Sequence, residues 1–260
     1  MSGDARELLQ AYLRQRAELG ETEVVLDGLG AAELRALYAR APQAPAAPPA
    51  RPAVGEPAMR PSPDAPAVGA AAEELLRLPT LDALREVALG CPRCRLAETR
   101  GHVVFGEGSP DADVLVVGEA PGAEEDRTGR PFVGRAGQLL TVLLASVGLS
   151  REEVYVCNVL KCRPPGNRNP QADEVEACSP YLLRQVELVK PRVVAAFGAF
   201  AAQTLLGTTT PVGKLRGRVH DFRGVPLVAT YHPAALLRSS AWVRPTWEDL
   251  QRLRAVLDRV

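Results

Sequence analysis

The stretch Asp113-Val-Leu-Val-Val-Gly-Glu-Ala-Pro-Gly122 joins a short apolar run to a turn of glycine and proline. Short apolar runs that end in such turns are typical of strands buried on both faces of a sheet. Three more runs of this kind follow, at 154–159, 192–197 and 225–230. Stretches with helical spacing separate them, at 136–147, 172–189 and 199–206. We therefore expect a three-layer α/β domain in which helices flank a central four-stranded parallel sheet.

Polar side chains stand where these predicted strands end. Glu119 follows the first strand, Asn158 ends the second and His232 follows the fourth. In parallel sheets ligands bind at the carboxyl ends of the strands, and the Gly118–Gly122 turn adds backbone N–H groups that suit an anion or a carbonyl. Each signal also has a plain structural interpretation. The turn is a common loop, Asn158 suits a turn, and His232 before a proline suits a helix cap.

Four cysteines form a second pattern: Cys91-Pro-Arg-Cys94, then Cys162 and Cys178. A Cys-x-x-Cys pair puts two thiolates on one tight turn, and the other two reach the same centre only if the fold brings distant segments together. Zinc sites usually show two short-spaced pairs, so one short pair favours a 4Fe–4S cluster over zinc or unliganded thiols. Cys157 lies in an apolar run and is interpreted as a small buried hydrophobic residue.

Composition limits the remaining alternatives. The chain has no run of eighteen apolar residues, and its first residues lack the apolar core of a signal peptide, so we expect a cytoplasmic protein without a membrane segment. A reducing compartment makes metal ligation a better use of cysteine than disulfides. The formal net charge is zero, so charge alone does not indicate a nucleic-acid binder. Local basic clusters fit either phosphate contact or a solvated surface: Lys161/Arg163/Arg168 and Lys214/Arg216/Arg218.

The N-terminal part has a different composition. Residues 41–70 contain nine prolines and ten alanines and no aromatic residue, which predicts a disordered, extended linker. Residues 1–40 contain apolar positions at helical spacing and are expected to form a short helical segment, either an appendage or a docking site for a protein partner. The remainder, 71–260, is expected to be the folded domain, with helical spacing again at 71–90.

Three segments resemble one known family: 118–134, Asn158-Val-Leu-Lys-Cys-Arg-Pro-Pro165 and His232-Pro-Ala-Ala-Leu-Leu-Arg238. They are similar to the family 4 uracil-DNA glycosylases, the iron–sulfur branch of that superfamily, over about residues 88–260. The resemblance implies a structural 4Fe–4S cluster held by the four cysteines. It also implies hydrolysis of the N-glycosidic bond of deoxyuridine, which leaves an abasic site for base excision repair. We accordingly expect uracil-containing DNA as the partner and a nucleoid-associated monomer.

The resemblance also implies roles for the residues at the strand ends. His232 would donate a hydrogen bond to uracil O2, together with backbone N–H groups of the turn that contains Gly118 and Ala120. The Asn158 amide matches N3–H and O4 of uracil, whereas cytosine presents the reverse pattern. Phe132 would stack on the flipped base, unless it is a plain core aromatic. Glu119 would orient water, exclude the thymine methyl or hold the turn, with Glu125 and Asp126 as weaker candidates.

The expected DNA contacts come from two segments. Leu236 or Leu237 would wedge into the base stack and Arg238 would bind a phosphate, as would Arg163 and Arg168. The alternative function is a non-catalytic iron–sulfur module that binds DNA or accompanies a polymerase. The joint presence of His232, Asn158 and Phe132 argues against it. No histidine follows Asn158 in a basic insertion, so the sequence does not indicate covalent trapping of DNA.

Overall fold

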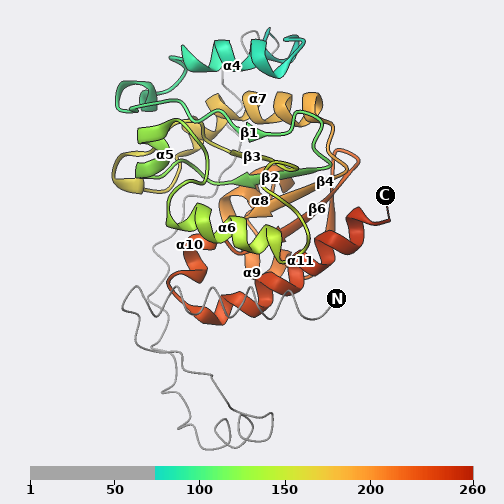
Figure 1. Cartoon of the computed structure of the whole chain (residues 1–260). Coiled ribbons are helices and arrows are strands. Elements are labelled where there is room, and N and C mark those ends of the chain that lie inside the picture. Colours follow the sequence, from blue (N-terminus) through green and yellow to red (C-terminus); the bar gives the residue numbers. More distant parts are fainter. Residues whose placement is uncertain (1–73, 260) are drawn as a thin grey trace, which may run out of the picture. The chain divides into compact units, whose positions relative to one another are not determined.

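The computed structural model describes residues 74–259 (Figure 1). The segments predicted at 1–40 and 41–70 lie outside the described residues and stay predictions. The strands are β1 Glu107–Gly108, β2 Val114–Gly118, β3 Tyr155–Asn158, β4 Val193–Phe197, β5 Val219–Phe222 and β6 Val225–Thr230. The longer helices are α4 Leu81–Leu89, α5 Ala123–Thr128, α6 Arg135–Ala145, α7 Ala172–Val189, α8 Ala199–Leu206 and α11 Val243–Leu257. Short helical turns are η1 Arg95–Glu98, η2 Pro165–Asn167, α9 Val212–Leu215, α10 Pro233–Leu236 and η3 Ser240–Trp242.

The sheet has six strands in the order β1-β3-β2-β4-β6-β5. Its four inner strands run parallel to one another, and they are the four strands predicted from the sequence. The prediction of a four-stranded, purely parallel sheet is wrong, because β1 and β5 add an antiparallel strand at each edge. The edge strands are short and mostly not buried, so they lack the continuous apolar run that revealed the inner strands.

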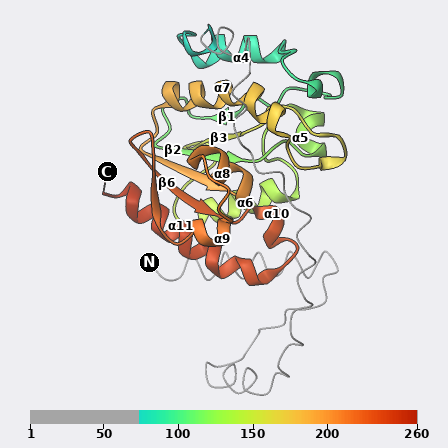
Figure 2. The same ribbon diagram turned by 180° about the vertical axis from the view of Figure 1, so that it is seen from behind.

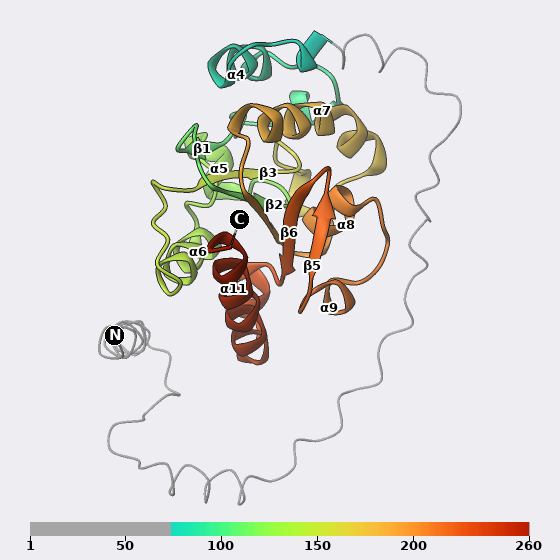
Figure 3. The same ribbon diagram turned by 90° about the vertical axis from the view of Figure 1, so that its right-hand side faces the viewer.

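Helices cover both faces of the sheet, which gives the expected three layers (Figures 1 and 2). α7 and α8 pack on one face, where Leu182 and Ala201 share a core with Leu115 and Val194 of the strands. α6 and α11 cover the other face, and α11 contacts β4 and β6. Figure 3 shows α7 on one side of the sheet and α6 with α11 on the other.

Helices α7 and α8 have the bounds that the sequence predicts. The helical stretch expected at 71–90 is interrupted at Pro79, because proline disfavours helical geometry at the residue before it. α4 begins after Thr80, whose hydroxyl accepts a hydrogen bond from Ala83 N at 3.2 Å, and it ends at Leu89, with Gly90 as its C-cap directly before Cys91. No described helix combines the length and the apolar character that a membrane span requires.

Candidate active site and cysteine centre

The carboxyl ends of the inner strands carry the residues that the sequence predicted there, and Phe132, Asn158 and His232 lie close to one another. Gly118 ends β2 and pairs in register with Asn158, which ends β3. His232 follows β6 and precedes α10. Phe132 comes from the loop between α5 and α6. We call Glu119, Phe132, Asn158 and His232 the strand-end site.

Gly118 lies so close to two of these residues that a side chain would not fit. A Cβ at Gly118 would lie 2.4 Å from Oδ1 of Asn158 and 2.4 Å from Cζ of Phe132. The ring of Phe132 in turn lies beside the imidazole of His232, with 5.6 Å between the ring centroids and 31° between their planes. The amide of Asn158 and the ring of Phe132 therefore flank one glycine, and the imidazole of His232 lies beside that ring.

The amide of Asn158 is held in place but not satisfied. Its Oδ1 is buried and has no hydrogen-bond partner among the described residues. Such an orphaned atom costs about 1–3 kcal/mol, and a bound ligand is one way to supply the missing bond. The main-chain oxygen of Asn158 accepts a hydrogen bond from Nζ of Lys161 at 2.7 Å, and the same ammonium donates to Gln185 at 2.6 Å. The backbone of Asn158 is thus anchored, while its side-chain oxygen lacks a hydrogen-bond donor.

His232 is neutral at pH 7 and has a defined tautomer. Burial lowers the pKa of His232 to about 4, and the positive charge of Arg238 acts in the same direction. Nδ1 accepts a hydrogen bond from Ala234 N at 3.2 Å, so His232 also caps α10, as its plain structural interpretation held. A neutral imidazole that accepts at Nδ1 carries its hydrogen on Nε2. His232 can therefore donate one hydrogen bond from Nε2.

The three acidic candidates have different surroundings. Glu125 accepts hydrogen bonds from the backbone N–H groups of residues 122, 133 and 134, at 2.9–3.1 Å. Asp126 accepts from the backbone of residues 101 and 102. Both carboxylates therefore hold loops together. Glu119 has no hydrogen bond to its carboxylate among residues 74–259, and burial raises its pKa. Of these three acidic residues, only Glu119 has a carboxylate that binds no backbone N–H group among residues 74–259.

The four cysteines predicted as ligands line one cavity. Cys91 follows α4, Cys94 caps η1, Cys162 lies just after β3, and Cys178 belongs to α7. Burial raises the pKa of the Cys178 thiol to about 12, and it also raises the pKa of Cys94 and Cys162. Cysteine thiols gathered at one cavity are donors that a metal centre deprotonates when it binds.

Two donors point at these sulfur atoms. Nη1 of Arg100 lies 3.4 Å from Sγ of Cys162, and the backbone N of Lys161 lies 3.3 Å from Sγ of Cys178. In the part of the chain that the structure describes, no three metal-binding side chains are grouped closely enough for a single ion. Cys157 is completely buried in the core, as predicted.

Known proteins are similar to this chain in sequence. The family model of the uracil-DNA glycosylase superfamily matches residues 105–251. The type-4 uracil-DNA glycosylase of Archaeoglobus fulgidus is 46% identical over 164 residues, which cover 60% of this chain and 82% of that protein. The type-4 enzyme of Thermotoga maritima is 45% identical over 173 residues, covering 65% and 90%, and that of Pyrobaculum aerophilum 46% over 169 residues, covering 62% and 86%.

The chain belongs to the type-4 branch of the uracil-DNA glycosylase superfamily. The resemblance drawn from the sequence motifs is thereby confirmed, and the alternative of a non-catalytic module is not favoured. In this type-4 member the region matched by the family model contains the whole strand-end site and also Cys162 and Cys178. Cys91 and Cys94 precede that region and meet the other two cysteines only through the fold.

The position of Leu236 does not suit its predicted role as a wedge in the DNA. Leu236 is only 4% exposed and packs inside the protein, so it cannot be the wedge. The sequence could not separate two adjacent leucines, because the four-residue helix α10 sets which of them faces inward. Leu237 is half-buried and Arg238 is exposed. Of the two leucines predicted as the wedge, Leu237 is the one with exposed surface, and Arg238 is accessible as its predicted role requires.

The three basic residues of the cluster Lys161/Arg163/Arg168 have different surroundings in the structure. Arg168 forms two hydrogen bonds, at 2.9 and 2.5 Å, with the buried carboxylate of Glu174, so its guanidinium is already used within the protein. Lys161 is 2% exposed, and its ammonium donates hydrogen bonds inside the protein. Arg163 is half-buried, and its Nε donates to Asn167 at 2.7 Å, within a short turn. Of this cluster only Arg163 remains suited to phosphate contact.

Two aromatic residues beside the strand-end site were missed. Tyr231, adjacent to His232, stacks on Trp242 with 4.4 Å between ring centroids, and Trp242 is 39% exposed. The guanidinium of Arg216 lies 5.7 Å above the Tyr231 ring. A tryptophan ten residues after a candidate catalytic histidine, in a chain with two tryptophans, is the signal that could have revealed this surface.

Proposed function

We propose that this chain flips deoxyuridine out of DNA and hydrolyses its N-glycosidic bond, releasing uracil and leaving an abasic site. The observation that carries the proposal is the buried, unpartnered Oδ1 of Asn158, which lies beside Gly118 at the carboxyl ends of the strands. The relatives from Archaeoglobus fulgidus and Thermotoga maritima, both named uracil-DNA glycosylases, support it. The reaction class is hydrolysis.

Base recognition follows from the amide. Oδ1 of Asn158 would accept the N3–H of uracil, and its amino group would donate to O4. Cytosine has an acceptor at N3 and a donor at position 4, so both contacts would become repulsive. A site built on such paired hydrogen bonds discriminates strongly, because the wrong base leaves buried groups unsatisfied. The ring of Phe132 would cover one face of the extruded base.

Leaving-group stabilisation is assigned to His232. Breakage of the C1′–N1 bond leaves an oxocarbenium-like sugar and a uracil anion, with negative charge on O2. A neutral imidazole that donates from Nε2 stabilises this anion without losing its proton, which is oxyanion-hole chemistry. The low pKa of His232 supports a neutral donor. Backbone N–H groups of the turn containing Gly118 and Ala120 would add to it.

Water would be oriented by Glu119. Glu125 and Asp126 already bind backbone N–H groups, which leaves the carboxylate of Glu119 to hold the water that adds to C1′. The raised pKa of Glu119 reflects its burial, and a desolvated carboxylate is a stronger hydrogen-bond acceptor for that water.

DNA binding would combine charge with stacking. Arg238 and Arg163 would bind phosphates, and Leu237 would fill the space that the flipped nucleotide leaves. Trp242, exposed beside Tyr231, would stack on a neighbouring base. Extrusion of a base costs a few kcal/mol, which these contacts would offset.

The four cysteines would hold a 4Fe–4S cluster. Support comes from their meeting at one cavity and from the single short-spaced pair Cys91/Cys94 in the sequence. When bound, such a cluster would be a structural link, because Cys178 is tied to Lys161 and Lys161 anchors Asn158. We also keep the predictions that the protein is a cytoplasmic, nucleoid-associated monomer and that residues 1–40 form a short helical segment, either an appendage or a docking site for a protein partner.

One assay tests the proposed reaction. The purified protein is incubated with a single-uracil oligonucleotide and the product is treated with alkali, which cleaves abasic sites. We expect scission at the uracil position and none in matched oligonucleotides with thymine or cytosine there. DNA binding without scission, from protein whose cluster is intact, would favour the non-catalytic module instead.

A further inference from the structure

Phe132 has a backbone conformation that bulky residues rarely adopt. Its φ is 51°, in the left-handed region where Cβ crowds the neighbouring backbone. Such a conformation persists only where the surrounding structure imposes it, and it concentrates at functional sites. Groups outside residue 132 must therefore supply the restraint.

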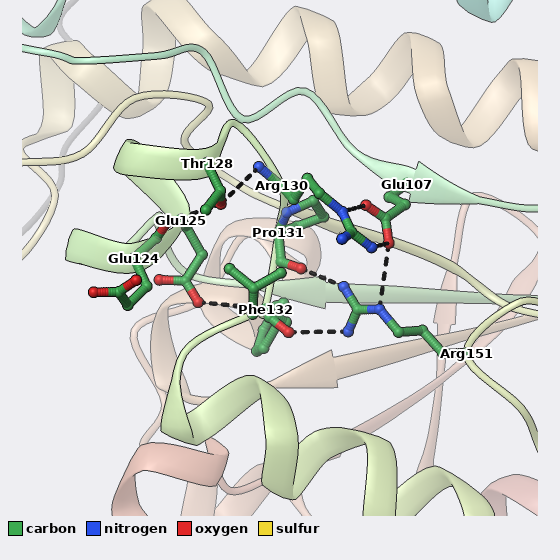
Figure 4. Close-up of polar contacts among 9 residues, drawn as sticks. Glu107, Glu124, Glu125, Thr128, Arg130, Pro131, Phe132 and Arg151 are labelled. Atoms are coloured by element: carbon green, nitrogen blue, oxygen red, sulfur yellow. Dashed lines mark hydrogen bonds and ion pairs between the residues drawn. The ribbon is translucent and has the colours of Figure 1, made fainter.

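The guanidinium of Arg151 supplies part of this restraint on the backbone of Phe132. Arg151 donates from Nη1 to the main-chain oxygen of Phe132 at 3.0 Å and from Nη2 to that of Pro131 (Figure 4). These two carbonyls belong to the two peptide groups that flank the Cα of Phe132. Because φ and ψ are the rotations between those peptide groups, a planar fork that binds both oxygens fixes both angles.

A carboxylate on the edge strand orients this fork. Oε1 of Glu107, in β1, lies 3.4 Å from Nε of Arg151. The same carboxylate binds Arg130, two residues before Phe132, through contacts of 2.6 and 2.9 Å. Hydrogen bonds from Arg130 lower the pKa of Glu107, so the carboxylate stays ionised. The Arg151 side chain is only 14% exposed, which makes this ion pair more than a solvated surface contact.

The loop is also restrained on its other sides. Oε1 of Glu125 binds the backbone N–H groups of Val133 and Gly134, both at 2.9 Å. A Cβ at Gly137 would lie 1.9 Å from the main-chain oxygen of Phe132, so α6 closely abuts the loop. The loop that presents Phe132 is thus fastened by charged groups that do not themselves belong to the strand-end site.

We infer that Arg151 is a positioning residue for the glycosylase reaction. It fixes the direction in which the Phe132 ring meets the flipped base, and Glu107 orients its guanidinium. This inference rests on the proposed function, since it names what holds the stacking group of the same site. It predicts that Arg151 affects catalysis only through Phe132.

A double-mutant cycle tests the inference. Arg151→Lys keeps the charge but cannot bind two carbonyls as a fork. We expect it to lower single-turnover uracil excision roughly 10–100-fold, the effect of misplacing a substrate-contacting group. In a Phe132→Ala background the same change should cost less than about twofold, because the group it positions is gone. Equal losses in both backgrounds would show a general structural effect and overturn the inference.

Two further variants complete the test. Glu107→Gln removes the orienting charge and should show the same non-additivity, which covers the case that Arg151→Lys does not fold. Arg127→Lys is the control, because that guanidinium pairs with Glu124 at 2.8 Å on the exposed side of α5. It should match the parent in both backgrounds.

A readout without activity separates this inference from the proposed function. If the parent protein excises no uracil, the proposed function is wrong. The positioning of Phe132 by Arg151 can still be tested by NMR. The aromatic resonances of Phe132, identified by their loss in Phe132→Leu, should shift in Arg151→Lys and stay in place in Arg127→Lys. Unchanged Phe132 resonances in a folded Arg151→Lys variant would overturn the inference whatever the activity.

Discussion

The ring of Phe132 and the imidazole of His232 lie with their centroids 5.6 Å apart, although one comes from a loop and the other follows the strand β6. A planar base stacked on Phe132 therefore has one edge within reach of His232. The third neighbour, Asn158, approaches Phe132 across Gly118. The stacking face, the donor to O2 and the base-reading amide would thus act on one bound base at the same time.

His232→Ala should slow the chemical step roughly 10²–10³-fold, about 3–4 kcal/mol, as does removal of one oxyanion donor. Single-turnover excision from a uracil oligonucleotide measures this. Affinity for uracil-free DNA should stay at the parent value, since the donor meets charge only as the bond breaks. His220→Ala is the matched control, because that ring binds the Leu215 carbonyl beside the edge strand β5. A His232→Ala rate equal to the parent rate would remove His232 from the mechanism.

Gly118→Ala should impair excision because the new Cβ would meet both the amide of Asn158 and the ring of Phe132 at 2.4 Å. Neither neighbour can move without leaving its position in the strand-end site, and we expect at least a tenfold loss, on the order of that caused by small displacements of substrate-contacting groups. The excision rate and the thermal unfolding midpoint should be measured together. Gly90→Ala is the control, since nothing lies within 4 Å of its Cβ. Full activity in Gly118→Ala would contradict the described packing.

Sequence reasoning succeeded where local pattern and chain topology determine the outcome. The four inner strands are buried on both faces, so their apolar runs were visible, and the ends of parallel strands must meet at one edge. The sequence therefore predicted that Asn158 and His232 lie at the same edge of the sheet. The edge strands β1 and β5 were missed because strands of two and four residues with exposed positions leave no periodic signal.

It failed where tertiary contacts decide the use of a side chain. Arg168 looked like a phosphate ligand, but Glu174, which also caps α7, binds it from a buried position. Leu236 and Leu237 differ only in the direction that a short helix gives them. The contact of Arg151 with two loop carbonyls has no sequence signature at all, since it depends on the path of the loop before α6, which Arg130 ties to Glu107 of β1.

Purified protein should be brown, with a broad absorbance in the visible range, if Cys91, Cys94, Cys162 and Cys178 hold iron and sulfide. Cys162→Ser should lose iron and solubility. Cys157→Ser should keep the parent iron content, because this buried thiol lies outside the cavity. Iron and zinc are measured by elemental analysis after anaerobic purification. Colourless protein with one zinc per chain would refute the cluster.

The pH dependence of excision should be set by Glu119 rather than His232. Burial raises the pKa of Glu119, so its carboxylate becomes protonated at a higher pH than an exposed glutamate as the pH falls. The pKa of His232 is about 4, so the imidazole stays neutral between pH 5 and pH 8. Single-turnover rates should therefore decline on the acid side through one ionisation. Glu119→Gln should be roughly 10²-fold slower and should lack this decline; an unchanged acid limb would assign it to another group.

Asn158→Asp tests base recognition most directly, because it replaces an amide that donates and accepts with a carboxylate that only accepts when ionised. Uracil O4 would then face a second acceptor, a mismatch that costs at least about 1–3 kcal/mol at a buried site. The amino group of cytosine would instead gain an acceptor, so we expect a large fall in uracil excision and weak, newly detectable cytosine excision. The cytosine activity should increase at lower pH, where the protonated carboxyl can donate to N3. Asn169→Asp adds the same charge at an exposed position and should change neither activity. If Asn158→Asp excised uracil at the parent rate, the amide would not contact the base, and the unpartnered Oδ1 would need another explanation.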